Sequence, residues 1–419
     1  MLGAQEKPPC GFLGDEDPVF VIPDKEVERF SPWLTLAGVA PGLLEGRQFH
    51  ALAAELPVFR GSLRGIPSPV LWRVFVSVSF LVQSYIWGDP GFPKVPRTHL
   101  PPGLAVIAYR LSTHLGVRPL LVYASYALKN WRRIDPGGPI SAENVTMLDH
   151  FNSQCVVERY RAEDWFVAIH VEIEHEARRL LRAMEEAEDA RLAGQVVELV
   201  LWLNDMSDSL SRMRHTLSRM SERCGPEVYY EFVRPYLSGF TKALIPSGVV
   251  YEGVNAYRGL PQYFDGQTGA QSSIMPALDR FLVIAHHSKD LSSHLGRMLH
   301  QHTPREHKAY VLAWAKRERF CDTTVRWKNL EKDSWVEDAL RNVRLQAALF
   351  RREHYILAIT HIARPAHRMF GETNPLGTGG SKLILSLFLH LEETLHPSER
   401  TERMKEFRQY FGELLGRPV

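Results

Sequence analysis

The sequence predicts an all-α protein, with a large helical domain and a smaller, mostly helical N-terminal domain. Apolar residues recur every three or four positions over long segments, which is the spacing of one face of a helix. No pair of strand-like runs joined by a tight turn is present, as a β-hairpin would require. The Pro-rich segment "WGDPGFPKVPRTHLPPG" (87–103) is the best candidate for a domain boundary. We therefore expect domains at 1–103 and 104–419.

Composition excludes several classes of protein. The chain has 419 residues, of which 45% are hydrophobic and 23% charged, as in ordinary soluble proteins. A formal net charge of +2 argues against a nucleic-acid partner, which usually requires a concentrated basic face. The four cysteines form no CxxC pair, so we expect a reducing, cytoplasmic setting.

The N-terminal region combines Pro-rich sequence with one strongly apolar segment. The first 65 residues hold only short amphipathic pieces, and nothing in them indicates their role. Residues 69–88 are apolar, but Arg73, Gln83 and three serines interrupt them, so we predict a buried helix. The N-terminus lacks a basic region followed by an apolar run, so we expect no export signal and no membrane partner.

Two further helices are predicted before residue 223. Ser141 follows the break "RRIDPGGP" and has the residue type of an N-cap. The segment 191–222 has nine apolar residues spaced alternately by four and three, which predicts one long helix packed on others or a dimerising coiled coil. These residues are Leu192, Val196, Leu199, Leu203, Met206, Leu210, Met213, Leu217 and Met220.

The segment 334–362 predicts a helix that carries histidines on its inward face. "SWVE" resembles a capping box that begins at Ser334, and Pro365 is expected to end the helix. The inward stripe includes His354 and His361, two turns apart. A buried neutral imidazole is costly unless its nitrogens find partners. The stripe therefore indicates either core histidines bonded to carbonyls or an axial haem ligand, with Arg351 and Arg352 suitably placed for propionates.

Two other patterns suggest chemistry less strongly. Glu172 with His175 and Glu393 with His396 have the Glu-x-x-His spacing of half a di-iron site, but their charged flanks are typical of solvated faces. The Gly-rich loops "GQTGAQSS" (266–273) and "GTGGS" (377–381) precede apolar helices without forming a Walker loop. Such loops cap helices or bring backbone N–H groups close to a ligand. Gly-x-Ser-x-Gly is absent, and no hydrolase arrangement is visible.

Several segments together resemble the indoleamine 2,3-dioxygenase family. They are "SYIWG" (84–88), "LLVYASYALKNWRRIDP" (120–136), "VRPYLSGF" (233–240), "VVYEGV" (249–254), "AQSSIMPALD" (270–279), "RREHYILAITHIARPA" (351–366) and "GTGGS" (377–381). The resemblance covers most of the chain from residue 84 onward. It implies haem b as cofactor and O2 as co-substrate, with cleavage of the indole C2–C3 bond of L-tryptophan to N-formylkynurenine in the kynurenine pathway. It also implies an electron donor for ferric haem, which the sequence does not identify.

The resemblance assigns roles by position. His354 matches the iron ligand, and Arg234 matches the arginine that binds the substrate carboxylate. The small residues at 266–273 would leave room for dioxygen and indole, and Thr378 would lie in a mobile loop that closes over substrate. The implied substrate contacts are Arg234, Tyr123, Tyr229, Asp164, Ala168, Thr268, Gly269, Ala270 and Thr378; the implied haem contacts are His354, Ala270, Asp279 and Arg351.

Three positions depart from the family pattern and concern the substrate. Asp164 stands where an aromatic wall is expected, Ala168 where a small hydroxyl residue is expected, and Tyr229 where phenylalanine is expected. A pocket-facing Asp164 would favour a ring that carries a hydrogen-bond donor; with a one-residue slip, Trp165 would form the wall and Asp164 would face solvent. The alternatives to tryptophan cleavage are a family enzyme for another indole in secondary metabolism and a non-catalytic haem-binding or signalling protein.

Overall fold

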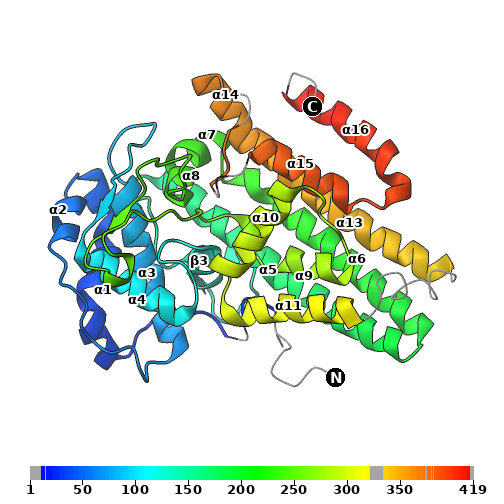
Figure 1. Ribbon diagram of the computed structural model, residues 1–419, viewed down its shortest axis with the longest axis horizontal. Coiled ribbons are helices and arrows are strands. Elements are labelled where there is room, and N and C mark those ends of the chain that lie inside the picture. Colours follow the sequence, from blue (N-terminus) through cyan, green and yellow to red (C-terminus); the bar gives the residue numbers. More distant parts are fainter. Residues whose placement is uncertain are drawn as a thin grey trace.

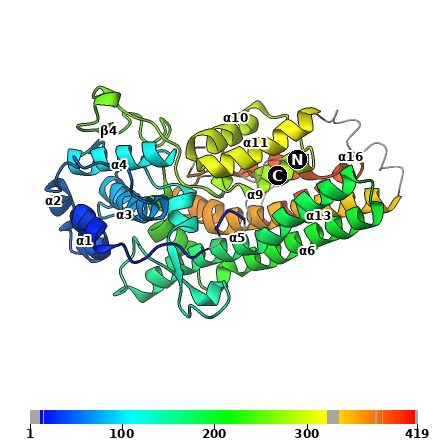
Figure 2. The same ribbon diagram turned by 90° about the horizontal axis from the view of Figure 1, so that it is seen from below.

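The computed structural model describes residues 11–14, 16–320, 334–372, 375–378, 380 and 382–415. Three long helices lie side by side along most of the molecule (Figures 1 and 2), and they confirm the all-α prediction. They are α5 (Val157–Leu192), α6 (Val196–Ser218) and α13 (Ser334–Ala358). Three shorter helices lie on the side of this layer away from α6: α9 (Ile274–Phe281), α10 (Lys289–Arg297) and α11 (Arg305–Phe320). Helix α15 (Leu383–Thr394) packs on α13 and is followed in the chain by α16 (Pro397–Leu415).

The N-terminal helices gather at one end of the molecule (Figure 1). They are α1 (Asp24–Glu45), α2 (Phe49–Ala54), α3 (Ser68–Trp87) and α4 (Pro102–Leu115). One hydrophobic core runs from these helices into the long ones, since it includes both Phe30 and Val343. The division into two domains at residue 103 stays a prediction.

Helix α3 is the buried helix that the sequence predicts. Among the described helices it alone is long and apolar enough to cross a membrane, but 89% of its apolar window is buried inside the protein. Its polar side chains have partners: Arg73 pairs with Asp149, and the Gln83 amide donates to the carbonyl of Tyr236 at 2.7 Å. A buried polar group with a satisfied hydrogen bond is tolerated in a core, so α3 is a core helix.

Two small strand pairs were not predicted. Strand β1 (His99–Leu100) pairs in parallel with β4 (Val250–Tyr251), and β2 (Trp131–Arg133) pairs antiparallel with β3 (Val145–Met147). Strands of two or three residues are too short to show alternation in a sequence.

Two predicted helix starts are corrected. Ser141 precedes only a 3₁₀ turn (Ala142–Asn144), and its side chain makes no capping bond, so the next helix begins at Val157. The predicted helix at 191–222 begins later, because Gly194 adopts a φ of 70° between α5 and α6. The apolar face of α6 packs on α5 and α13 of the same chain, so it serves the core.

Proline widens two helices at the centre of the molecule. Pro365 was expected to end a helix, but α13 continues through a π turn (Ile359–Ala363) into α14 (Arg364–Phe370). Proline has no N–H to donate to the carbonyl four residues before it, and the Arg364 N–H instead bonds the Ile359 carbonyl, five residues back. A second π turn (Tyr229–Val233) precedes Pro235 in α8 (Arg234–Leu237) in the same way. π turns occur frequently at functional sites.

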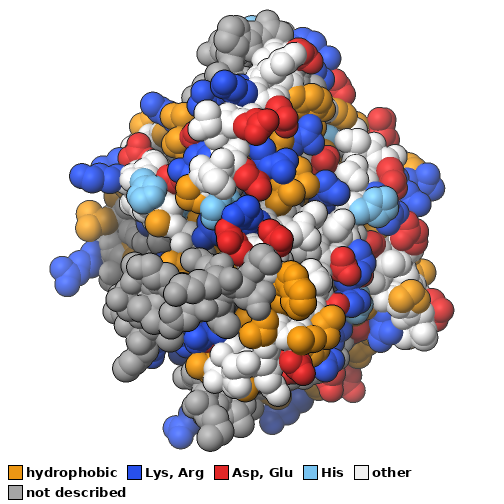
Figure 3. Space-filling model, turned by 90° about the vertical axis from the view of Figure 1, so that its right-hand side faces the viewer, with side chains coloured by type: hydrophobic (Ala, Val, Ile, Leu, Met, Phe, Trp, Pro, Cys, Tyr) orange, Lys and Arg blue, Asp and Glu red, His pale blue; other side chains and the backbone are white. Residues whose placement is uncertain are grey.

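The remaining short elements connect these helices. They are α7 (Pro226–Val228), the π turns Ala124–Leu128 and Met298–His302, and the 3₁₀ turns Arg219–Glu222, Asn255–Tyr257 and Gly269–Gln271. On the surface, Figure 3 shows basic and acidic side chains interspersed over the right-hand face of Figure 1. This mixture agrees with the small net charge of +2.

Candidate functional site

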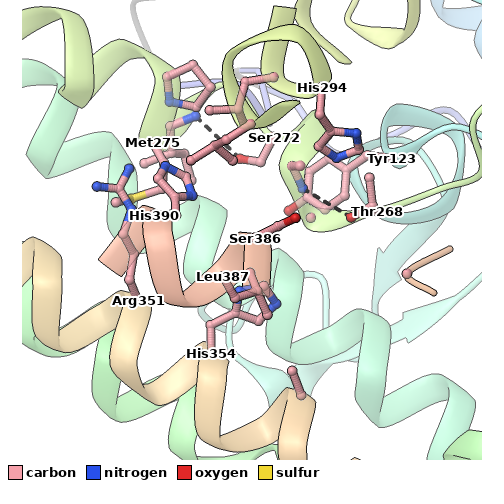
Figure 4. Close-up of a pocket in the computed structure, with 18 of the residues that line it drawn as sticks. Tyr123, Thr268, Ser272, Met275, His294, Arg351, His354, Ser386, Leu387 and His390 are labelled. Atoms are coloured by element: carbon pink, nitrogen blue, oxygen red, sulfur yellow. Dashed lines mark hydrogen bonds between the residues drawn. The ribbon is translucent and has the colours of Figure 1, made fainter. Parts of the chain in front are cut away.

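A cavity of about 550 Å³ lies between α5, α9, α10, α13 and α15. Figure 4 shows His354 and Arg351 rising from α13, with Tyr123 and Thr268 on the other side of the cavity in this view. Its walls are largely apolar, with residues such as Phe166, and its polar groups, several histidines among them, come from different helices and loops. A large apolar cavity with a few convergent polar groups is the usual form of a cofactor or ligand site.

The His354 side chain is accessible only from within this cavity. The surrounding protein separates the residue from bulk solvent. This burial and, to a smaller extent, the nearby His170 lower the pKa of His354 to about 4. Much of the residue's surface is nevertheless accessible, because it faces the cavity. No hydrogen bond joins the ring to any residue that the structure describes. The imidazole is therefore neutral at pH 7 and offers a free lone pair, which is the state that a metal ligand requires.

His361, two turns further along, also lines the cavity, but both of its ring nitrogens have partners. It is buried, with Nε2 3.0 Å from the carbonyl oxygen of Cys224 and Nδ1 3.2 Å from that of Leu357. Both ring nitrogens face backbone acceptors. Of the two interpretations of the stripe, His361 fits the core histidine, and His354 fits the ligand.

One end of the cavity is rich in hydrogen-bond donors. Arg351 donates to both oxygens of Asp279 at 2.7 and 2.8 Å, while its own Nε is buried with no partner. Burial alone would raise the pKa of Asp279, but Arg351, His286 and His390 hold it well below its usual range, so the pair is ionised. His390 also lines the cavity, and burial followed by Arg351 lowers its pKa to about 3.

Asp279, His286 and His390 place one ligand atom each within 4.8 Å of one another, which resembles a metal site. Arg351 already occupies both oxygens of Asp279, and a cation there would face its guanidinium. The unpartnered Arg351 Nε, and the His390 Nε2 that lies 3.6 Å from Asp279 Oδ2, suit an anionic group better. The two Glu-x-x-His pairs form no di-iron site: Glu172 accepts from Ala142 N and Thr216 Oγ1. Glu393 instead bonds His286.

These groups together fit a haem. The cavity offers a ligand histidine with a free lone pair at His354, donors for propionates at Arg351 and His390, and apolar walls for the porphyrin faces. Arg352 does not contribute to the cavity, because its guanidinium lies over the rings of Phe407 and Tyr410.

Small residues at 266–273 have two different functions. The Thr378 carbonyl accepts from Gly239 N at 3.3 Å and from Gly266 N at 3.2 Å, which holds three backbone segments together. A methyl group on Gly266 would overlap the Gly239 nitrogen and the Leu237 and Thr378 carbonyls, whereas one on Gly269 would meet nothing within 4 Å. Gly266 therefore permits close backbone packing, and Gly269 leaves space beside the cavity. Thr268, Gly269, Ala270 and Thr378 all line the cavity.

A buried carboxyl group lies directly behind the cavity wall. Glu174 accepts from Tyr123 Oη at 2.9 Å and from Ser272 Oγ at 2.8 Å, and its Oε2 has no partner. Burial raises its pKa to about 7, while these two bonds oppose the rise. The sequence did not indicate Glu174 as a site residue, because its segment is heavily charged. Its spacing of four from His170 and Phe166, which puts the three residues on one helix face, was the only pattern that pointed to the cavity.

The register predicted for the start of α5 is wrong. Asp164 does not line the cavity, because its Oδ1 accepts from Met147 N at 2.7 Å, Thr146 Oγ1 at 3.0 Å and His150 Nε2 at 3.1 Å. The one-residue slip to Trp165 fails as well, since its indole N–H donates to the Arg219 carbonyl.

Two residues further along than predicted, α5 does reach the cavity. Phe166 supplies the aromatic wall, and its ring stacks on that of Tyr229 at 5.1 Å. Ala168 lies in the core, outside the cavity lining. His170 occupies the position beside the aromatic wall that was expected for Ala168. A one-sequence alignment cannot fix the register of a helix that follows an irregular loop.

Arg234 lies at the edge of the site and is not part of its lining. One guanidinium nitrogen donates to the carbonyl of Leu376, next to the cavity residues Gly377 and Thr378. Its Nε is buried without a partner. A buried guanidinium with a donor to spare is suited to a carboxylate.

Comparison with known proteins gives a consistent result. A family model described as "Indoleamine 2,3-dioxygenase" matches residues 6–397. Indoleamine 2,3-dioxygenase 1 of Mus musculus is 29% identical over 306 residues, covering 71% of each chain. Indoleamine 2,3-dioxygenase acdA of Aspergillus candidus is 28% identical over 401 residues, covering 91% of this chain and 93% of its own. The 6-hydroxytryptophan 2,3-dioxygenase fscD of Fusarium equiseti is 26% identical over 383 residues, covering 90% and 89%.

Proposed function

The chain belongs to the indoleamine 2,3-dioxygenase family, and on this basis we propose that it cleaves the C2–C3 bond of L-tryptophan with O2 to give N-formylkynurenine. The observation that carries the proposal is His354, whose neutral ring has no hydrogen-bond partner among the described residues and faces a cavity of about 550 Å³. An imidazole nitrogen without a partner in an apolar cavity costs free energy unless a ligand binds its lone pair. A haem b, when bound, supplies the iron that activates dioxygen.

Two groups of residues would hold that cofactor. His354 on α13 would bind its iron, and Arg351 Nε and His390 Nε2 would donate to its propionates. The guanidinium of Arg351 is held at two nitrogens, because its Nη2 donates to both oxygens of Asp279 and its Nη1 donates to Thr394 Oγ1. Neither partner needs to gain or lose a proton during the reaction.

The remaining cavity residues suit an aromatic amino acid. Phe166 and Tyr229 form a stacked apolar wall for the indole ring. Arg234, beside Thr378, is the group that we assign to the substrate carboxylate. The apolar lining excludes water, which keeps the charged carboxylate paired and the reacting ring oriented.

The position of Asp164 supports plain tryptophan over a hydroxylated ring. Its carboxylate accepts three hydrogen bonds outside the cavity, so it is not available to a ring hydroxyl. Relatives in this family include enzymes named for indoleamine and one named for 6-hydroxytryptophan. Among the described residues that line the cavity, no comparable carboxylate lies on the aromatic wall formed by Phe166 and Tyr229.

The test is formation of the product itself. Protein reconstituted with haem is given L-tryptophan, a reductant and ¹⁸O-labelled dioxygen, and the product is identified by mass spectrometry. We expect N-formylkynurenine carrying two labelled oxygen atoms, and a lower rate with 6-hydroxytryptophan. Protein that holds haem and binds tryptophan, but releases no N-formylkynurenine, would overturn the proposal and leave the non-catalytic alternative.

A further inference from the structure

His170 is one of several histidines that line the cavity, and none of the roles assigned above uses it. It lies on α5, one turn after Phe166, and it lines the same cavity as His354. Its Nδ1 lies 2.7 Å from the Phe166 carbonyl oxygen. A carbonyl can only accept a hydrogen bond, so the proton of the ring resides on Nδ1. The other nitrogen, Nε2, then presents a lone pair.

Burial keeps this ring in its neutral form. Burial lowers the pKa of His170, and the bond to Phe166 opposes that shift only in part. The ring is nevertheless partly accessible, as His354 is, because it borders the cavity. Within the described part of the chain, no residue hydrogen-bonds Nε2. The result is a hydrogen-bond acceptor, fixed in tautomer and orientation, at the cavity surface.

The neighbours of His170 show which part of a ligand would reach it. Its ring lies 4.5 Å from that of Phe166 and 6.0 Å, edge on, from that of Tyr123. Phe166 in turn stacks on Tyr229. The acceptor is therefore set within the aromatic wall, where a flat apolar ring would lie.

We propose that His170 Nε2 accepts the hydrogen bond of the indole N–H of the substrate, and so selects rings that carry this group. The inference rests on the proposed function, since it concerns the same site. A buried acceptor and a buried N–H each cost free energy when left unpaired. A site built to hydrogen-bond a substrate N–H rejects an isostere that lacks it much more strongly than it rejects a change of size.

The test compares tryptophan with an isostere that has no N–H. L-Tryptophan and 3-(benzothiophen-3-yl)-L-alanine are titrated into the ferric haem protein, and binding is followed by the haem absorption spectrum. The wild type should prefer tryptophan by more than tenfold. In His170→Phe and His170→Ala this preference should fall below threefold, chiefly through weaker tryptophan binding.

Two further variants separate this role from a structural one. His170→Gln keeps an acceptor oxygen and should retain part of the preference for tryptophan. If the other variants do not fold, the preference of His170→Gln is compared with that of the wild type. His175→Ala is the matched control, because His175 lies on the same helix but outside the cavity, and it should bind both ligands as the wild type does.

The outcomes distinguish the inference from the function on which it rests. An unchanged preference in His170→Phe or His170→Ala overturns the inference alone. So does a ferric spectrum that changes from six-coordinate bis-imidazole to five-coordinate in His170→Ala, because His170 would then bind the iron itself. A wild-type protein that takes up no haem, or binds no tryptophan, refutes the proposed function first.

Discussion

The backbone N–H of Gly266 donates to the carbonyl of Thr378 at 3.2 Å, which joins two loops that are 112 positions apart in the chain and border the same cavity. Gly266→Ala should weaken this junction, because a methyl group would overlap backbone atoms of Gly239, Leu237 and Thr378. We expect a loss of about 1–3 kcal/mol or more in the free energy of unfolding, as for other overpacked sites. Denaturant titration measures this loss.

Gly269→Ala is the matched control for that change. An added methyl group there meets nothing within 4 Å, so the fold should keep its stability. Because Gly269 lines the cavity, the variant should narrow the space for ligand, and a tryptophan titration would detect this change. Equal stability of the two alanine variants would contradict the packing account.

Glu174→Gln should change the way in which stability depends on pH. The ordinary pKa of a glutamate is 4.5, and burial raises that of Glu174 to about 7 in the folded protein. Between pH 4.5 and about 7, the unfolded chain releases a proton that the folded chain keeps. The contribution of Glu174 to the free energy of unfolding is therefore fully present below pH 4.5 and is lost as the pH rises to about 7. The full loss is about 3 kcal/mol.

Thermal unfolding of wild type and Glu174→Gln at pH 5 and pH 8 measures this contribution. The glutamine variant does not titrate, so the wild type should lose stability relative to it between the two pH values. A difference in melting temperature that stays constant from pH 5 to pH 8 would show that Glu174 is not a buried, neutral acid.

The register of α5 can be tested with two single substitutions. Asp164→Phe removes the acceptor of Met147 N and two other donors, so it should lower the free energy of unfolding by about 1–3 kcal/mol. The ratio of affinities for tryptophan and hydroxytryptophan should stay the same. Phe166→Ala removes the aromatic wall and should weaken binding of both ligands. A changed ratio in Asp164→Phe would place that residue in the cavity.

Arg234→Ala should weaken binding of the substrate carboxylate while leaving the haem spectrum intact. The wild type should bind tryptophan more than tenfold tighter than tryptamine, which lacks the carboxylate, and tenfold corresponds to about 1.4 kcal/mol. Spectral titration of both ligands into the variant should show that this preference has gone. If the variant still prefers tryptophan to the same degree, another group binds the carboxylate.

Patterns within one helix could be predicted from the sequence. The apolar stripe of α13 predicted that His354 faces inward, and this residue lines the cavity. The capping-box pattern "SWVE" predicted that the helix begins at Ser334, and α13 does begin there, although the Ser334 side chain lies outside the described residues. The same stripe could not separate His354 from His361, because the carbonyl of Cys224 that bonds His361 comes from 137 positions away.

Features that depend on distant partners could not be predicted. The charged segment after Glu172 resembled a solvated face, yet Glu185 is buried because Arg317, 132 positions away, pairs with it at 3.1 Å. Glu174 was hidden for the same reason, since Tyr123 and Ser272 satisfy it from other parts of the chain. The prediction that Pro365 ends a helix was wrong, because a local pattern does not show that a helix can continue past a proline through a π turn.

The central claim is that His354 binds the haem iron, and haem content tests it most directly. Wild type, His354→Ala and His361→Ala are purified with excess haem, and bound haem per chain is measured together with the ferric spectrum. We expect one haem in the wild type and in His361→Ala, and loss of most haem in His354→Ala with partial recovery on adding imidazole. A full complement of haem with an unchanged spectrum in His354→Ala would contradict the account.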